Sequence, residues 1–189
     1  MNRFLVYLLA AGHGTRAGGP KAWLAHEGKS LLERHIEFLV RHFPPMSVAV
    51  SVQEPWLDGC RILHPLVQWV PVDHKAAPLG AFQELLAVMP LTKWAFLYHV
   101  DMPIWDDELF YTLTSYLPKG GELPAEAIVP MHGGRRGHPI LLSPQLCDQL
   151  TALDPERDRL DHFLRGRRVH HVEVPHACVV ENWNEGPKG

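Results

Sequence analysis

Two segments of the sequence carry residue types suited to binding phosphate groups and a metal ion. The first spans residues 12–21 and contains four glycines together with Arg16 and Lys21. Glycines let the backbone approach a phosphate closely, while backbone N–H groups and basic side chains balance its charge. The second is Asp101-Met102-Pro103, whose carboxylate is suited to hold Mg²⁺ beside bound phosphates. Each segment alone also fits an ordinary turn, but together they predict a site for a nucleoside triphosphate and Mg²⁺.

Both segments follow apolar runs that predict buried strands. Residues 4–11 are uninterrupted apolar residues, and residues 93–100 are largely apolar. Such runs are typical of parallel strands that are covered on both faces. Because ligands bind at the carboxyl ends of parallel strands, we expect the glycine-rich segment and Asp101 to meet at one edge of the sheet, with Asp101 at an exposed strand tip. The first run also resembles the apolar core of a signal peptide, but it is short for one, and a glycine-rich loop follows it.

The rest of the chain alternates between helical and strand patterns. Ser30 and Glu33 are spaced as a capping box at the start of the first helix. The expected helices span residues 31–40, 78–89, 106–117 and about 156–164. The expected further strands span residues 46–52, 67–72, 127–130, 139–142 and 168–174, with a short irregular piece after the first. This order predicts an α/β fold: a three-layer, mainly parallel, Rossmann-like sheet with helices on both faces and residues 1–189 as a single domain.

Composition narrows the class of protein. The chain has 189 residues, is 46% hydrophobic and has a formal net charge of −3, which argues against disorder and against a nucleic-acid binder. No apolar stretch approaches the length that crosses a bilayer, so no membrane association is expected. Three widely spaced cysteines fit buried thiols in a reducing cytoplasm. The 13 histidines show no spacing typical of a metal site.

Two familiar phosphate-binding motifs match parts of the sequence, but the residues around them do not meet the structural requirements of either motif. Residues 12–17 satisfy the dinucleotide pattern G-x-G-x-x-A, but Gly18-Gly19-Pro20 would break the helix that this pattern requires. Gly28-Lys29-Ser30 resembles the tail of a P-loop, but Trp23 stands where the earlier glycine is needed. A dinucleotide-dependent oxidoreductase is therefore the less favoured alternative, and a non-catalytic nucleotide-binding module stays open.

Five short motifs, in order along the chain, resemble those of the MobA-like NTP transferases, nucleotidyltransferases that act on molybdopterin and related acceptors. Residues 9–21 are similar to the family signature L-A-[AG]-G-x-[GS]-x-R-M-G-x-x-K, and residues 28–33 to its G-K-x-L-[LI]-E segment. Residues 77–81 resemble its G-P-L-x-G helix start, and Asp101-Met102-Pro103 matches its D-x-P. Residues 137–140 match the G-H-P-[VI] strand of the molybdopterin branch. The resemblance implies a sheet of the nucleotide-diphospho-sugar transferase type.

The resemblance also assigns residues to roles. It implies nucleotide contacts from Leu9, Ala10, Ala11, Gly12, Lys21, Asp73 and Gly80. It implies that the catalytic residues are Arg16, Lys21 and Asp101, with the first two on the triphosphate. The Mg²⁺ ligands would be Asp101 and Asn184, and His138 would lie on the acceptor side of the cleft.

The implied reaction moves a nucleoside monophosphate from GTP or CTP to a phosphorylated acceptor, with molybdopterin or the molybdenum cofactor as the expected acceptor and pyrophosphate as the other product. Residues 10–12 favour the cytidylyl branch, whereas residues 78–80 favour the guanylyl branch, so the base stays open. The chain departs from the family pattern at Ala17 and Ala77, where methionine and glycine are usual. The closing N-x-[ND]-T-P-E-D stretch is present only as residues 182–187.

Overall fold

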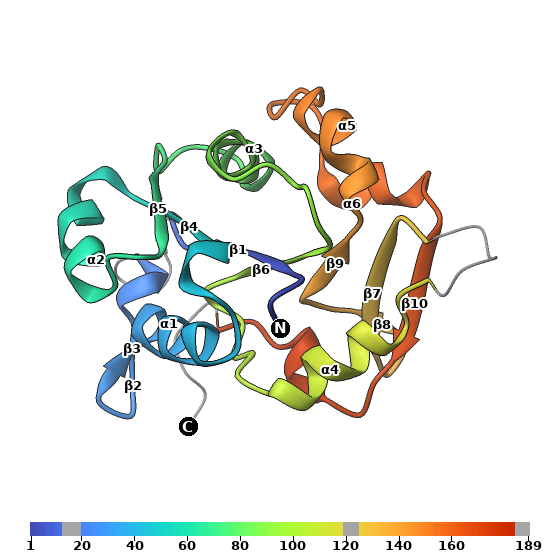
Figure 1. Cartoon of the computed structure of the whole chain (residues 1–189), viewed down its shortest axis with the longest axis horizontal. Helices are drawn as coiled ribbons and strands as arrows, with labels where there is room; N and C mark the ends of the chain where they lie inside the picture. The colour runs from blue at the N-terminus through green and yellow to red at the C-terminus, as the bar shows by residue number, and fades with distance from the viewer. Residues whose placement is uncertain (13–19, 119–124, 184–189) are drawn as a thin grey trace.

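A mixed, mainly parallel sheet runs through the molecule, with helices on both of its faces (Figure 1). The structure is a computed structural model that describes residues 1–12, 20–118 and 125–183. The strand order is β5-β4-β1-β6-β9-β7-β10, with β8 paired to β7. The strands of this sheet are β1 (Leu5–Leu9), β4 (Val48–Val52), β5 (Gln68–Pro71), β6 (Ala95–His99), β7 (Ala127–His132), β8 (Arg135–Arg136), β9 (Ile140–Leu142) and β10 (Val169–Glu173). A separate hairpin pairs β2 (Ala25–His26) with β3 (Lys29–Ser30).

Strand direction places the carboxyl ends of the central strands along one edge. β1 pairs in parallel with both β4 and β6, and β4 pairs in parallel with β5. β9 runs antiparallel to β6 and β7, while β10 is parallel to β7. The segments that follow β1, β4, β5 and β6 therefore emerge on the same side of the molecule. Strands from near both ends of the described chain share one sheet, so the described residues form one domain. The predicted domain, residues 1–189, also includes the residues outside the described ranges.

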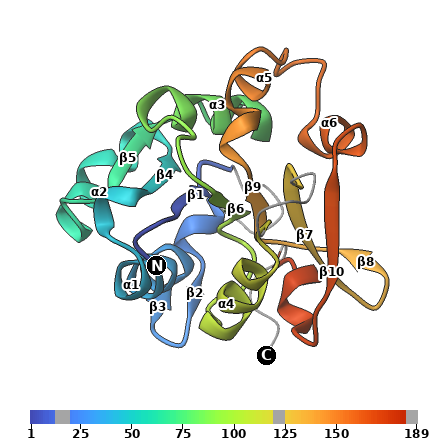
Figure 2. The same ribbon diagram turned by 45° about the vertical axis from the view of Figure 1, so that its right-hand side comes forward.

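Helices cover the sheet in two layers that Figures 1 and 2 show from two sides. The helices are α1 (Leu31–His42), α2 (Leu57–Leu63), α3 (Pro78–Val88), α4 (Asp107–Ser115), α5 (Cys147–Thr151) and α6 (Leu160–Arg165). One apolar core lies between the sheet and α1, α2 and α4, and a second lies between the sheet and α3, α5 and α6. The predicted three-layer α/β arrangement is confirmed.

β1 shows how one short strand serves both cores. All five of its residues are buried, and they alternate between the two apolar clusters. Val6 and Leu8 pack toward α1 and α4, while Tyr7 and Leu9 pack toward α3. An apolar run without alternation is what a strand covered on both faces requires. Residues 5–9 therefore form an interior strand of the sheet, between β6 and β4.

Local sequence signals set the helix starts. Ser30 accepts a hydrogen bond from the backbone N–H of Glu33, whose carboxylate accepts one from the N–H of Ser30, which completes the predicted capping box of α1. Pro78 occupies the first turn of α3, where the missing N–H has no intrahelical partner to lose.

The charged segment 156–164 was expected to be one helix, and this is wrong. The helix α6 begins only at Leu160. Ahead of it, the Asp154 side chain accepts a hydrogen bond from the N–H of Glu156, and its carbonyl accepts one from the N–H of Asp158. Asp154 and Pro155 thus hold a turn that delays the helix.

The predictions also differ from the structure on the other side of the sheet. Residues 57–63, expected to be irregular, form α2 behind the 3₁₀ turn Glu54–Trp56, which contains Pro55. The strand expected from residue 46 begins at Val48, since Pro45 starts a 3₁₀ turn. Neither change moves the carboxyl ends of the central strands. Among the described helices, none combines the length and apolar character needed to cross a membrane.

Candidate functional site

Lys21 and Asp101 meet where β1 and β6 end. Lys21 begins the 3₁₀ turn Lys21–Trp23, and Asp101 lies two residues beyond β6. The Lys21 Nζ atom forms an ion pair and hydrogen bond with Asp101 Oδ2. The side chains are 22% and 7% exposed, so the lysine compensates a carboxylate that is almost fully buried. Two residues 80 positions apart are thus brought together as predicted, but the expectation of an exposed strand tip for Asp101 is wrong.

The second carboxylate oxygen of Asp101 is available to a ligand. Its Oδ1 atom is buried and has no hydrogen-bond partner among the described residues. A buried, unpartnered carboxylate oxygen is destabilising unless something else satisfies it. A divalent cation such as Mg²⁺ is one such partner, since it prefers carboxylate oxygens. The position therefore fits a metal ligand.

The backbone around Asp101 is held on three sides. The N–H of Val100 donates to the carbonyl of Leu9, which joins the ends of β6 and β1. The N–H of Trp183 donates to the carbonyl of Asp101 at 2.8 Å, which fastens the end of the described chain to the site. The His35 Nε2 atom lies 3.0 Å from the carbonyl oxygen of Val100. Each bond restricts where the carboxylate can move.

His35 is a structural histidine whose neutral form is fixed by its neighbours. It is fully buried, and its Nδ1 atom accepts a hydrogen bond from Trp105 Nε1 at 3.2 Å. Since Nδ1 accepts, Nε2 carries the proton and donates to Val100. Burial lowers the pKa of His35 to about 4, with the hydrogen bond to Val100 and the charge of Asp101 acting in the opposite direction.

Aromatic side chains enclose this support from the outside. The ring of His26 stacks on Trp105 at 6.0 Å and lies edge-on to Trp183 at 4.8 Å. The guanidinium of Arg34 lies 5.4 Å from the centre of the Trp105 ring, in cation–π geometry. Because Trp105 also bonds His35, the hairpin, α1 and residue 183 are packed as one unit behind Asp101.

The segment after β1 is anchored before it reaches the glycine-rich loop. The N–H of Ala10 donates to the carbonyl and the hydroxyl of Ser51, each at 3.1 Å. The Gln53 side chain donates to the carbonyl of Ala11 at 3.0 Å. These bonds fix the path of the chain up to Gly12. Arg16, like the rest of residues 13–19, lies outside the described residues, and so does Asn184.

Asp73 and Gly80 occupy structural positions at the same edge. Asp73 follows β5, and its carboxylate accepts a hydrogen bond from the N–H of Lys75 in an Asx turn. β5 is two strands from β1, which is about 10 Å across the sheet. A Cβ atom at Gly80 would lie 3.3 Å from the Cβ of Pro155, so this glycine allows α3 to approach the 155 turn closely.

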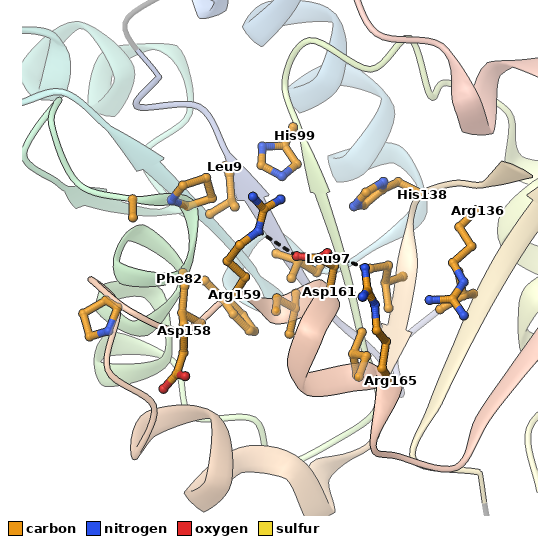
Figure 3. Close-up of a pocket in the computed structure, with 18 of the residues that line it drawn as sticks. Leu9, Phe82, Leu97, His99, Arg136, His138, Asp158, Arg159, Asp161 and Arg165 are labelled. Atoms are coloured by element: carbon orange, nitrogen blue, oxygen red, sulfur yellow. Dashed lines mark hydrogen bonds and ion pairs between the residues drawn. The ribbon is translucent and has the colours of Figure 1, made fainter.

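A cavity of about 810 Å³ opens beside the ion pair, between the start of α3, the sheet and α6 (Figure 3). Of the predicted site residues, Leu9 and His138 line it, while Lys21, Asp101, Asp73 and Gly80 do not. His99 lines it as well, and its ring lies edge-on to that of His138 at 5.7 Å. The charge of Asp101 acts on both imidazoles.

Both cavity histidines are held in the neutral form. Burial and the neighbouring His99 together lower the pKa of His138 to about 3, against the opposing effect of Asp101. Burial and the charge of Lys21 also lower the pKa of His99. Neutral imidazoles can exchange hydrogen bonds with a ligand but add no charge to the cavity.

The segment that carries His138, between β8 and β9, is held by a close backbone approach. The N–H of His138 donates to the carbonyl of Val179, and the N–H of Gly137 donates to that of Pro130, both at 2.8 Å. A Cβ atom on Gly137 would lie only 2.3 Å from the Val179 oxygen, so no other residue fits there without a shift. The glycine of the G-H-P motif is therefore required by packing.

The described residues hold no group of three or more histidine, cysteine, aspartate or glutamate side chains that could bind a metal alone. A cation at Asp101 would need ligands from elsewhere, such as phosphate oxygens or water. This is the usual arrangement for Mg²⁺, which takes one or two protein carboxylates together with substrate oxygens. The fold and these residues define a class: an α/β protein with a candidate ligand site at the carboxyl ends of its parallel strands.

The family follows from a comparison of sequences. Residues 6–174 match the model of the MobA-like NTP transferase domain, and the chain belongs to that family of nucleotidyltransferases. No curated protein matches the sequence significantly.

Solved structures share the fold at low sequence identity. Rv0371c from Mycobacterium tuberculosis H37Rv superposes with a TM-score of 0.73 and 20% identity over 97% of this chain and 95% of its own, and a manganese complex of that protein is also similar. Molybdopterin-guanine dinucleotide biosynthesis protein A from Archaeoglobus fulgidus gives 0.65 and 18% over 89% and 83%. A 4-diphosphocytidyl-2C-methyl-D-erythritol synthase gives 0.66 and 15% over 96% and 92%. At these identities the likeness establishes the fold alone.

Several residues at the site were not found by sequence reasoning. His35, Trp105 and Trp183 support Asp101 from three distant segments, and no local motif marks them. His99 precedes Asp101 by two residues, and alternation along β6 was a signal for it, because both side chains then leave the strand on the same side. The arginines of residues 157–165 lie in or beside the segment expected to be a charged helix, and the sequence assigned them no role.

Proposed function

We propose that the chain transfers a nucleoside monophosphate from GTP or CTP to a phosphorylated acceptor and releases pyrophosphate. The observation that carries this proposal is the meeting of Lys21 and Asp101 at the carboxyl ends of β1 and β6. A lysine suited to phosphate and a carboxylate suited to a cation are the two charges that a metal–triphosphate complex needs. The acceptor phosphate would attack the α-phosphorus directly, without a covalent enzyme intermediate.

Lys21 and Asp101 take complementary parts in this proposal. Lys21 would exchange its bond to Asp101 for a phosphate oxygen, together with Arg16 from the glycine-rich loop. Asp101 would then hold Mg²⁺ through its buried carboxylate, with Asn184 as a second protein ligand. Bound Mg²⁺ supplies charge stabilisation on the phosphates as they transfer. The manganese complex of the similar M. tuberculosis protein supports a divalent cation in this fold.

The nucleotide would lie along the edge of the sheet, against the backbone of residues 9–12. Asp73 and Gly80 belong to this half of the proposed site. Leu9 is the one residue of residues 9–12 that also lines the cavity, so in this proposal it would lie at the boundary between nucleotide and acceptor. His138, across the cavity, stays on the acceptor side.

Molybdopterin or the molybdenum cofactor is the proposed acceptor. The support is the family, the G-H-P motif around His138, and the similarity to a molybdopterin-guanine dinucleotide biosynthesis protein. The similarity to a diphosphocytidyl synthase keeps CTP beside GTP as the donor. The three cysteines, all free thiols, agree with a reaction in the reducing cytoplasm.

A two-part experiment tests the proposal. Thermal unfolding is first recorded with GTP, CTP, UTP or ATP, each with Mg²⁺ or Mn²⁺. A bound nucleotide at 100 times its Kd adds about 2.7 kcal/mol to the free energy of unfolding, so the preferred base should give the largest rise in Tm. Pyrophosphate release is then measured with molybdopterin as the acceptor. Stabilisation by one nucleotide together with acceptor-dependent pyrophosphate supports the proposal; no stabilisation by any of the four contradicts it.

The same experiment separates the alternative of a non-catalytic binding module. Such a module would be stabilised by a nucleotide but would release no pyrophosphate with any phosphorylated acceptor. The family match does not favour a non-catalytic module. Loss of activity would, however, explain two departures from the family motifs, Ala77 and the altered stretch 182–187.

A further inference from the structure

One wall of the cavity beside the ion pair consists of residues to which the proposed function assigns no role. Its floor is apolar and belongs to the sheet: Leu97 on β6, Val129 on β7 and Ile140 on β9 are all buried. Its opposite wall is the segment 155–165, which is rich in charge. At about 810 Å³, the cavity is within the usual range for a small-molecule site.

Two arginines of this wall are joined by one carboxylate. Arg159 donates from Nε to Asp161 Oδ1 at 2.9 Å, and an Nη atom of Arg165 lies 3.6 Å from Asp161 Oδ2. Figure 3 shows the three side chains converging, with Asp161 between the two guanidinium groups. Because Asp161 contacts only Nε of Arg159 and one Nη of Arg165, further N–H donors of both groups can reach a ligand.

The carboxylate at the centre stays ionised. Burial raises the pKa of Asp161, but the hydrogen bond from Arg159 and the charges of Arg159, His162 and Arg165 together hold this pKa below its ordinary value. Two guanidinium groups and one carboxylate leave the trio with one net positive charge. The two guanidinium groups thus outnumber the carboxylate that joins them.

Two other charged residues of the wall, Asp158 and Arg157, have separate partners, while Glu156 also lines the cavity. The Asp158 carboxylate accepts a hydrogen bond from the N–H of Asp154, and Figure 3 shows it pointing away from Arg159. Arg157 pairs with the Asp154 side chain at 3.5 Å. Arg136 lines the cavity from β8, on the side of Arg165. Arg159 and Arg165 are therefore the pair that the wall holds over the apolar floor.

We propose that Arg159 and Arg165 bind an anionic group of the acceptor in this cavity, while the apolar floor holds the acceptor's body. The identification of the ligand as the acceptor rests on the proposed function, but binding of an anionic ligand at the two arginines can be tested without it. It predicts an acceptor that combines a flat or apolar body with an acidic group. The two arginines are thus specificity-determining residues, since planar guanidinium groups favour phosphate and carboxylate geometry over neutral groups.

A binding experiment uses phenyl phosphate as the probe and benzyl alcohol as its neutral counterpart. Binding to the whole chain is measured by ligand-observed NMR titration. We expect phenyl phosphate to bind, benzyl alcohol to bind far more weakly, and the Arg159→Gln and Arg165→Gln variants to lose at least about tenfold in affinity for phenyl phosphate. Arg159→Lys keeps the charge but not the planar fork and should fall between wild type and Arg159→Gln.

Arg61→Gln is the matched control. Arg61 pairs with Asp58 at the same 3.6 Å and is 59% exposed, against 64% for Arg165, but it belongs to α2 and does not line the cavity. It should bind phenyl phosphate as the wild type does. No binding by the wild type at millimolar concentration, or equal affinity in Arg61→Gln and both wall variants, overturns the inference.

Kinetics then separate this inference from the proposed function. If pyrophosphate is released, the wall variants should raise the KM for the acceptor at least about tenfold and leave the KM for the nucleotide unchanged. If no acceptor supports turnover but phenyl phosphate still depends on the two arginines, the proposed function fails and the anion site stands. If turnover is normal and both KM values are unchanged in the variants, the anion site fails and the proposed function stands.

Discussion

The two sides of the site are built in opposite ways. Asp101 is buried, and the backbone of residues 100–101 is held by three hydrogen bonds to distant parts of the chain. Arg159 and Arg165, across the cavity, are 72% and 64% exposed and are held by a single carboxylate on their own short helix. The first arrangement fixes one atom in space, whereas the second presents charge on long side chains that can adjust.

This difference suggests a division of labour. A carboxylate that must meet a cation and a triphosphate gains from a fixed position, because misplacement by 1 Å can reduce a rate a hundredfold. A charged wall that selects an acceptor needs the right charge more than an exact position. Substitutions on the Asp101 side should therefore change turnover and stability together, while substitutions in the wall should change acceptor binding alone.

Replacement of Asp101 should have the largest effect. Asp101→Asn keeps the shape of the side chain but removes its charge, so the cation loses a ligand and Lys21 loses its partner. We expect turnover to fall by at least about a thousandfold, roughly 4 kcal/mol, and the free energy of unfolding to fall by about 1–3 kcal/mol. Pyrophosphate release and urea unfolding measure the two. The control is Asp107→Asn, which changes an exposed aspartate on α4. Near wild-type turnover in Asp101→Asn would contradict the proposed difference between the fixed Asp101 side and the arginine wall.

The support behind Asp101 should show as acid sensitivity. The pKa of His35 is about 4 in the folded chain and about 6.5 when unfolded, so below pH 6.5 the unfolded state takes up a proton that the folded state refuses. Stability is therefore complete above pH 6.5 and falls, by roughly 3 kcal/mol from this one residue, as the pH decreases toward 4.

Two variants isolate this effect in unfolding curves recorded from pH 7 to pH 4. His35→Leu should be less stable at pH 7 by about 1–3 kcal/mol, because the Val100 carbonyl and the Trp105 N–H lose their partner, but its stability should depend less on pH. The residual dependence should come from His99 and His138, whose pKa values are also lowered. His170→Gln, at an exposed position, should keep the wild-type curve. An unchanged slope in His35→Leu would show that His35 is not the sensitive group.

Lys21 should matter for the nucleotide more than for the acceptor. Lys21→Ala removes one charge from the proposed triphosphate site and should weaken nucleotide binding by about 10- to 100-fold, a loss of about 1.4–2.7 kcal/mol. Thermal shift across a GTP and a CTP titration measures it. Lys93→Ala, at the opposite end of the β6 segment, should bind as the wild type does. Wild-type affinity in Lys21→Ala would exclude the glycine-rich loop as the triphosphate site.

The same contrast explains what could be predicted from the sequence. The apolar runs 4–11 and 93–100, together with Pro78 and the Ser30–Glu33 capping box, are local signals, and each led to the correct element. Lys21 and Asp101 were predicted together because each follows a parallel strand, a consequence of topology. The burial of Asp101 was missed, since it depends on Trp183, 82 residues further along the chain.

The wall could not be predicted for a different physical reason. A helix pattern over residues 156–164 was read from charge and spacing, but an aspartate and a proline at 154–155 form a turn first. The later start of α6 changes which side chains face the sheet. Exposed arginines also occur on any solvated helix, so nothing local distinguishes Arg159 and Arg165 until the cavity is seen.

Removal of the wall arginines should have the smallest effect on stability, and this sharpens the comparison most directly. Arg159 and Arg165 are exposed, and pairs between exposed side chains contribute about 0–1 kcal/mol. We expect Arg159→Ala and Arg165→Ala to change the free energy of unfolding by less than about 0.5 kcal/mol, as Arg61→Ala should on α2. Urea unfolding measures all three. A loss of about 2 kcal/mol in either wall variant would mean that the arginines hold α6 in place, and the contrast between a fixed carboxylate and an adaptable charged wall would then be wrong.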